Sequence, residues 1–217
     1  MSELTLVQKI AVSVLPVLFA ITLHEVAHGW VARKLGDPTA YMLGRLSLNP
    51  IRHIDPIGTV LVPLLLMMMG GFIFGWAKPV PVTWENLRNP RRDMALVALA
   101  GPMTNLAMAL VWGVIAKVGY LTMSMAPLPG RMLILMGAMG IFINLVLMVL
   151  NLIPLLPLDG GRIVSSLLPR RAAAKFNLIE PYGFIVLLGL LVTGVLGYLM
   201  MGPVNVLQRM IYAILGL

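Results

Sequence analysis

Long runs of apolar residues, each carrying only a few polar positions, dominate this sequence. A helix needs about 20 such residues to cross a bilayer. The pattern therefore predicts an all-α membrane protein, a polytopic bundle of about five to six transmembrane segments. The expected elements are a helix over 7–34, a re-entrant or β region over 57–82, spans over about 94–118, 132–152 and 182–201, and a terminal segment over 203–217.

The region 57–82 differs from the other apolar runs because basic residues flank it on both sides. Arg52 precedes the run, Lys78 and Arg88 follow, and the pair Gly70-Gly71 interrupts it. A single crossing would place one basic flank on the wrong side of the membrane. We therefore expect a re-entrant element or membrane-associated β-hairpin, covered by protein or facing a water-filled cavity.

Composition supports the membrane assignment and excludes other classes. The 217 residues are 59% hydrophobic and only 11% charged, with a mean hydropathy of +0.95. Soluble domains carry about 25% charged residues, so a soluble globular protein, a disordered chain and a nucleic-acid-binding domain are excluded. We expect one integral-membrane domain, 1–217, with the lipid bilayer as its surroundings. The net charge of +8 is typical of basic loops that record topology.

The basic residues predict the orientation of the chain in the cell membrane. Arg33, Lys34 and Arg45 follow the first helix, whereas only Lys9 lies near its start. The positive-inside rule places the basic loop in the cytoplasm and the N-terminus outside. Further basic residues at 162–175 mark the cytoplasmic side again, giving a multi-pass protein.

The first apolar segment contains the pattern His24-Glu25-Val26-Ala27-His28. Histidines four residues apart project from one face of a helix and bind zinc together, and the Glu between them reaches a water molecule on the metal. Ionisable groups inside a membrane span are costly, so they predict a functional site. The other interpretation is a polar pair that neighbouring helices satisfy.

A catalytic zinc ion needs a third protein ligand, and the chain has no cysteine to supply it. His53 lies among loop residues, where a solvated histidine is the usual interpretation. Asp159 ends an apolar stretch, Leu-Leu-Pro-Leu-Asp-Gly-Gly-Arg, which favours a ligand over a simple turn residue. Asp159 lies three residues before the basic Arg162, so it falls on the same side of the membrane as the histidines.

Three asparagines within apolar segments are candidates for substrate contact. Asn105 follows Gly101-Pro102, and Asn144 and Asn151 are seven residues apart on one helical face. An Asn amide donates to a developing oxyanion or holds a peptide carbonyl. The alternative for all three is a hydrogen bond between helices.

These motifs resemble the site-2 protease family of intramembrane zinc metalloproteases. The resemblance rests on His-Glu-Val-Ala-His at 24–28, Gly-Pro-Met-Thr-Asn at 101–105, and Asn-Leu-Ile-Pro-Leu-Leu-Pro-Leu-Asp-Gly-Gly-Arg at 151–162, and it extends over about residues 15 to 170. It implies Zn2+ bound by His24, His28 and Asp159, with Glu25 as the catalytic carboxylate. It also implies substrate handling by Asn105 and Asn151, and membrane β-structure to which a substrate adds as a strand. The chain is expected to be a minimal core form, without PDZ or CBS modules.

The expected function is hydrolysis of peptide bonds within or near transmembrane segments of membrane-protein substrates, as in regulated intramembrane proteolysis. The sequence predicts neither the physiological substrate nor the oligomeric state. One alternative is a Ste24/HtpX-like membrane zinc protease, in which a downstream Glu, here Glu180, completes the site. Another is a metal-binding transporter or inactive scaffold, although a transporter would need polar residues along the full membrane depth.

Overall fold

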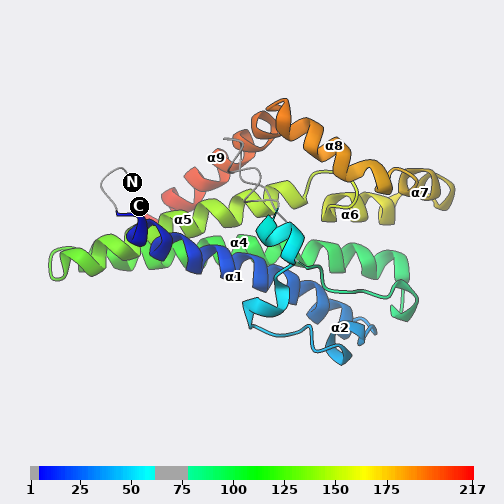
Figure 1. Ribbon diagram of the computed structural model, residues 1–217, viewed down its shortest axis with the longest axis horizontal. Helices are drawn as coiled ribbons and strands as arrows, with labels where there is room; N and C mark the ends of the chain where they lie inside the picture. Colours follow the sequence, from blue (N-terminus) through cyan, green and yellow to red (C-terminus); the bar gives the residue numbers. More distant parts are fainter. Residues whose placement is uncertain (1–4, 62–77) are drawn as a thin grey trace.

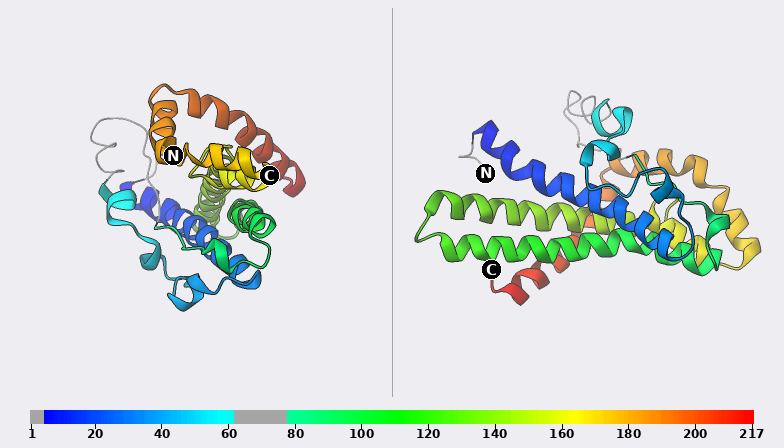
Figure 2. Two further views of the ribbon diagram at one scale, coloured as in Figure 1. Left: turned by 90° about the vertical axis from the view of Figure 1, so that its right-hand side faces the viewer. Right: turned by 90° about the horizontal axis from the view of Figure 1, so that it is seen from below.

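Three long helices form the frame of the molecule. The computed structural model describes residues 5–61 and 78–217. The frame consists of α1 (Leu6–Lys34), α4 (Pro90–Thr122) and α5 (Pro127–Asn151). These helices lie side by side, and a short loop joins α4 to α5 as an antiparallel pair (Figures 1 and 2). Each of the three is long and apolar enough to cross a membrane.

Shorter elements cover the ends and one side of this frame. Within the described residues they are α2 (Thr39–Met42), the 3-10 helices Pro50–His53 and Trp84–Asn86, a π-helix (Pro56–Leu61), α6 (Asp159–Leu167), α7 (Arg170–Asn177), α8 (Glu180–Val192) and α9 (Val195–Leu215). Helices α2, α6 and α7 lie toward the end of the frame where α1 finishes and α4 begins, while α8 and α9 fold back over α5 (Figure 1). The start of α1 and the C-terminus lie toward the opposite end (Figure 1).

Local sequence accounts for where the helices begin. Thr5 and Gln8 form a reciprocal capping box at the start of α1. Pro90 and Pro127 occupy the first turn of α4 and α5, where a missing backbone N–H costs nothing. Gly194 adopts a left-handed conformation with φ of 75° and separates α8 from α9.

Small residues let α4 and α5 pack closely, as is usual for membrane helices. A Cβ atom on Gly140 would lie 2.2 Å from Cγ of Trp112, and one on Gly137 would lie 2.6 Å from Cβ of Ala116. Helix α9 completes the same core, which contains Ala109, Trp112, Ile141, Leu145, Val204 and Ile211. The packing fixes α4 and α5 as a rigid pair beside α1.

The predicted fold class is wrong in two respects. Among residues 5–61 and 78–217, three helices qualify as membrane spans, or four if α7 and α8, which bend by 60°, form one broken span, rather than five to six. The β-hairpin is not supported, because the part of the chain that the structure describes contains helices and loops and no strand. Within the predicted region 57–82, the first residues belong to the π-helix Pro56–Leu61, and residues 62–77 lie outside the described part.

The physical reason is that charge and apolar content restrict where a segment's ends lie, not how its backbone pairs. The same reasoning explains why the helix boundaries differ from those of the predicted span over 182–201. The break there occurs at Gly194, in the middle of an apolar run, so α8 ends at Val192 and α9 runs through the predicted boundary at 203.

Candidate metal centre

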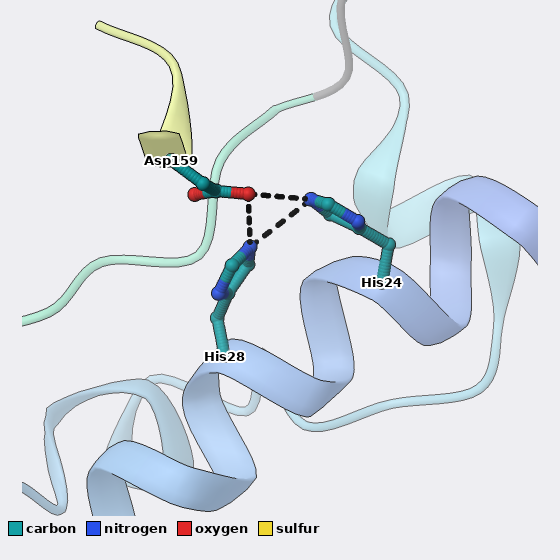
Figure 3. Close-up of side chains that lie close together, drawn as sticks. All are labelled: His24, His28 and Asp159. Atoms are coloured by element: carbon teal, nitrogen blue, oxygen red, sulfur yellow. Dashed lines mark hydrogen bonds and ion pairs between the residues drawn. The ribbon is translucent and has the colours of Figure 1, made fainter. Parts of the chain in front are cut away.

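Two histidines of α1 and the first residue of α6 meet inside the molecule. His24 and His28 are one helical turn apart, so their side chains project from the same face of α1, and they are only 7% and 8% exposed. A turn after Asn151 reverses the chain, so that Asp159 at the start of α6 faces α1. Figure 3 shows both imidazoles pointing at the Asp159 carboxylate.

The three inward atoms form a compact triangle. Nε2 of His24 lies 3.0 Å from Nε2 of His28, and Oδ2 of Asp159 lies 3.3 Å and 3.4 Å from these two nitrogens. Zinc bonds of about 2.0–2.1 Å in tetrahedral geometry separate neighbouring ligand atoms by about 3.3 Å. The triangle therefore has the size of one face of a zinc coordination sphere. Within the described residues, these three side chains form a group that could hold a metal ion.

Hydrogen bonds at the Nδ1 atoms of the two imidazoles turn the Nε2 atoms toward the centre of the triangle. Nδ1 of His28 lies 2.7 Å from the Val97 carbonyl oxygen, and Nδ1 of His24 lies 2.6 Å from Oδ1 of Asn105. Both partners are acceptors, so each Nδ1 donates its proton to its partner, and each Nε2 is the ring atom that faces the centre. Oδ2 of Asp159 is buried without a hydrogen bond. Three potential ligand atoms thus converge on one point, and two imidazoles with one carboxylate suit Zn2+.

Gly101 of α4 lies directly against the two rings. A Cβ atom there would come within 2.5 Å of both Cε1 of His24 and Nε2 of His28. Any larger residue would collide with the imidazoles and displace them. The glycine therefore leaves room beside the two nitrogens that face Asp159.

Glu25 lines a cavity of about 580 Å³ that also reaches His24, His28 and Asp159. Its Oε2 accepts a hydrogen bond of 2.8 Å from the backbone N–H of Val80. The remaining wall is largely apolar and includes Val80, Val97, Phe184 and Leu187. The site thus combines a metal-type ligand set, a carboxylate and room for an extended apolar chain.

Two side chains from the loop after α1 hold the segment 78–83, of which residues 79–82 line the cavity. Arg45 donates to the Lys78 carbonyl oxygen at 2.9 Å, and fully buried Asp37 accepts from the Thr83 backbone N–H at 2.7 Å. Burial alone would raise the pKa of Asp37, but hydrogen bonds from Thr39, Asn86 and Thr83 lower it below its usual value. The carboxylate is therefore kept ionised as an anchor.

The three asparagines occupy different places. Asn151 lines the cavity, and its Nδ2 donates to the Leu147 carbonyl oxygen at 3.0 Å. Asn105 and Asn144 are fully buried behind His24 and do not line this cavity. That placement favours a supporting position over contact with a substrate.

The other candidate ligands lie elsewhere. His53 is not the solvated histidine expected from the sequence: it ends the 3-10 helix Pro50–His53, is buried, and has Nε2 2.8 Å from the Ser47 carbonyl oxygen. Glu180 pairs with Arg162 at 3.4 Å, and its side chain is 43% exposed. Sequence reasoning did not single out the Val80 N–H, because a backbone group leaves no signal in residue type; the Pro-Val-Pro-Val stretch around it was the available indication.

The chain is similar to one protein family and to several named proteins. The model of peptidase family M50 matches residues 118–193. The chain is 40% identical over 200 residues to "Putative zinc metalloprotease YwhC" of Bacillus subtilis, covering 88% of this chain and 85% of that protein. It is 30% identical over 180 residues to "Putative zinc metalloprotease Rip2" of Mycolicibacterium smegmatis, covering 81% and 64% respectively.

A more distant relative is "Putative zinc metalloprotease MJ0611" of Methanocaldococcus jannaschii, 28% identical over 154 residues, which cover 71% of this chain and 69% of that protein. No solved structure matches the chain. The long match to YwhC and the family match together show that the chain belongs to peptidase family M50, the site-2 protease family.

Proposed function

We propose that His24, His28 and Asp159 hold the zinc ion of this protein, and that Glu25 is its catalytic carboxylate. As a member of family M50 the chain is an intramembrane zinc metalloprotease, and Zn2+ is its cofactor. The observation that carries the residue assignment is the convergence of three potential ligand atoms beside Glu25 in one cavity. The substrates are membrane proteins, cut within or near a transmembrane segment.

The residues around the cavity have separate tasks in peptide hydrolysis. When bound, zinc supplies Lewis acidity to a water molecule and to the scissile carbonyl. The Glu25 carboxylate takes a proton from the water and passes it to the leaving nitrogen. The Val80 N–H, donating to Oε2 of Glu25, fixes the orientation of that carboxylate. Asn151, on the cavity wall, is the candidate donor to the developing oxyanion.

The substrate must be extended where it is cut. A transmembrane helix hides its carbonyl groups in i to i+4 hydrogen bonds, so these bonds must open before a carbonyl can be attacked. Segments with Gly or Pro near the cut open at lower cost. The apolar wall formed by Val80, Val97 and Leu187 suits the side chains of such a segment.

The site is proposed to lie toward the cytoplasmic side of the cell membrane, within a single domain over 1–217. His28 lies six residues before Lys34, and basic residues also begin α4 and α7 at the same end of the frame. The positive-inside rule assigns that end to the cytoplasm.

The Glu180 alternative is disfavoured by placement. Glu180 pairs with Arg162 and does not line the cavity, whereas Asp159 faces both imidazoles. Membership of family M50 also decides against the Ste24/HtpX-like alternative and the transporter.

Zinc content and cleavage by purified variants test the assignment. Glu25→Gln should keep about one zinc per chain and lose at least ~100-fold in cleavage of a transmembrane peptide. Asp159→Ala should lose zinc, while the matched control Glu180→Gln should keep both zinc and cleavage. Cleavage by Glu25→Gln at the rate of the unchanged protein, or zinc loss in Glu180→Gln but not in Asp159→Ala, would contradict the assignment.

A further inference from the structure

A line of hydrogen bonds connects α5 to the His24 ring through two buried asparagines. Nδ1 of His24 lies 2.6 Å from Oδ1 of Asn105. Nδ2 of Asn105 donates to Oδ1 of Asn144 at 3.0 Å and to the Ala20 carbonyl oxygen at 3.2 Å. Nδ2 of Asn144 donates to the Gly140 carbonyl oxygen at 2.8 Å. Three helices, α1, α4 and α5, thus contribute to one continuous network.

The network has a fixed direction, set by its two backbone ends. A backbone carbonyl only accepts, so the Gly140 carbonyl requires the NH2 group of Asn144 and turns Oδ1 of Asn144 toward Asn105. The Ala20 carbonyl and that Oδ1 both require the NH2 group of Asn105. Oδ1 of Asn105 therefore faces His24, and Nδ1 of His24 must donate.

His28 is oriented differently. Its Nδ1 bonds to the main-chain carbonyl of Val97, which every residue type would supply at that position. His24 depends on a side chain, and that side chain depends on a second one. Both asparagines are 0% exposed, so water does not replace either partner.

We propose that Asn105 and Asn144 are positioning residues that hold His24 in the tautomer and orientation that zinc binding needs. This inference rests on the proposed role of His24 as a ligand. Removing a group that hydrogen-bonds to the outer nitrogen of a metal-binding histidine typically weakens metal binding by about 10–100-fold. Asn144 bonds to Asn105 and to the Gly140 carbonyl rather than to His24, so it acts on His24 only through Asn105.

Zinc affinity of the purified protein, measured by competition with a chelator, tests the proposal without relying on activity. Asn105→Leu should weaken binding by about 10–100-fold, and Asn144→Leu by a smaller factor. The double variant should bind no more weakly than Asn105→Leu alone, because the second residue has nothing left to act through. Asn105→Asp keeps an acceptor for His24 but loses the NH2 group that the Ala20 carbonyl and Asn144 require, so its zinc affinity should lie between those of Asn105→Leu and the unchanged protein.

Leu145→Ala is the matched control, because Leu145 is equally buried beside Asn144 but lies outside the network. It should lower the unfolding temperature and leave zinc affinity unchanged. Unchanged affinity in both asparagine variants, or independent losses that multiply in the double variant, would overturn the proposal. If Asn105→Leu fails to fold, the zinc affinities of Asn144→Leu and Leu145→Ala are compared instead. A loss of affinity in Asn144→Leu but not in Leu145→Ala supports the proposal, and equal affinities overturn it. A His24→Ala variant that keeps its zinc would instead overturn the ligand set itself.

Discussion

Replacing Gly101 by alanine should damage the metal centre far more than it damages the fold. The added Cβ would lie 2.5 Å from Cε1 of His24, 2.5 Å from Nε2 of His28 and 2.7 Å from Nε2 of His24. Ordinary contacts between carbon atoms lie at about 3.5 Å. The rings would therefore have to retreat by about 1 Å, which is a large fraction of the 3.0–3.4 Å sides of the ligand triangle.

The size of the effect follows from the cost of overpacking. Inserting a methyl group into a filled site typically costs about 1–3 kcal/mol. In the zinc-free protein the histidines relieve this strain by rotating, and the better helix propensity of alanine returns about 0.5–1 kcal/mol. In the zinc complex the rings cannot rotate away. The strain then appears as a loss of zinc affinity of about 5- to 150-fold, at ~1.4 kcal/mol for each factor of ten.

Chelator competition and thermal unfolding, with and without zinc, separate the two effects. Gly189→Ala is the matched control, because Gly189 is also helical, in α8, and has no neighbouring atom within 4 Å of an added Cβ. It should leave zinc affinity unchanged. Wild-type affinity in Gly101→Ala, or an equal loss in Gly189→Ala, would refute the reasoning.

Three further results are expected. Asp37→Asn should lower the free energy of unfolding by about 1–3 kcal/mol at pH 7, because the Thr83 N–H loses a charged acceptor. Since the pKa of Asp37 is lowered in the fold, its contribution is full above about pH 4 and declines as the pH falls further, so unfolding curves of the two proteins should converge there. Arg45→Gln removes the support of the Lys78 carbonyl and should raise KM for a transmembrane peptide while zinc content stays constant. Removing zinc with a chelator should lower the unfolding temperature of the unchanged protein but not that of Asp159→Ala.

The sequence was most informative where chemistry depends on local spacing. Residues four apart on a helix share a face whatever surrounds them, so His24 and His28 could be paired before any fold was known. Asp159 is 131 residues away from His28, but an acidic residue ending an apolar stretch is uncommon enough to stand out. Its position on the same side of the membrane followed from the basic residues nearby.

Directions of hydrogen bonds could not be predicted in the same way. Asn105 and Asn144 stood out as polar residues in apolar segments, but whether an amide faces a cavity or another helix depends on distant carbonyl groups. The Gly140 and Ala20 carbonyls decide it here. Backbone breaks were equally hidden, because Gly194 lies in a run whose apolar content continues on both sides.

The face of α4 that supports the metal centre has a simple pattern once the two helices are placed together. Val97, Gly101 and Asn105 are spaced four residues apart, as are His28 and His24 on α1. The Val97 carbonyl bonds to His28, Asn105 bonds to His24, and Gly101 lies between them against both rings. The two helices therefore meet in opposite directions with matching periods. In this arrangement Gly-Pro-Met-Thr-Asn is a physical complement to His-Glu-Val-Ala-His: its first residue gives the rings room and its last one orients a ring. Substitutions at 97 that fit the space leave the carbonyl in place, whereas substitutions at 101 or 105 act directly on the histidines.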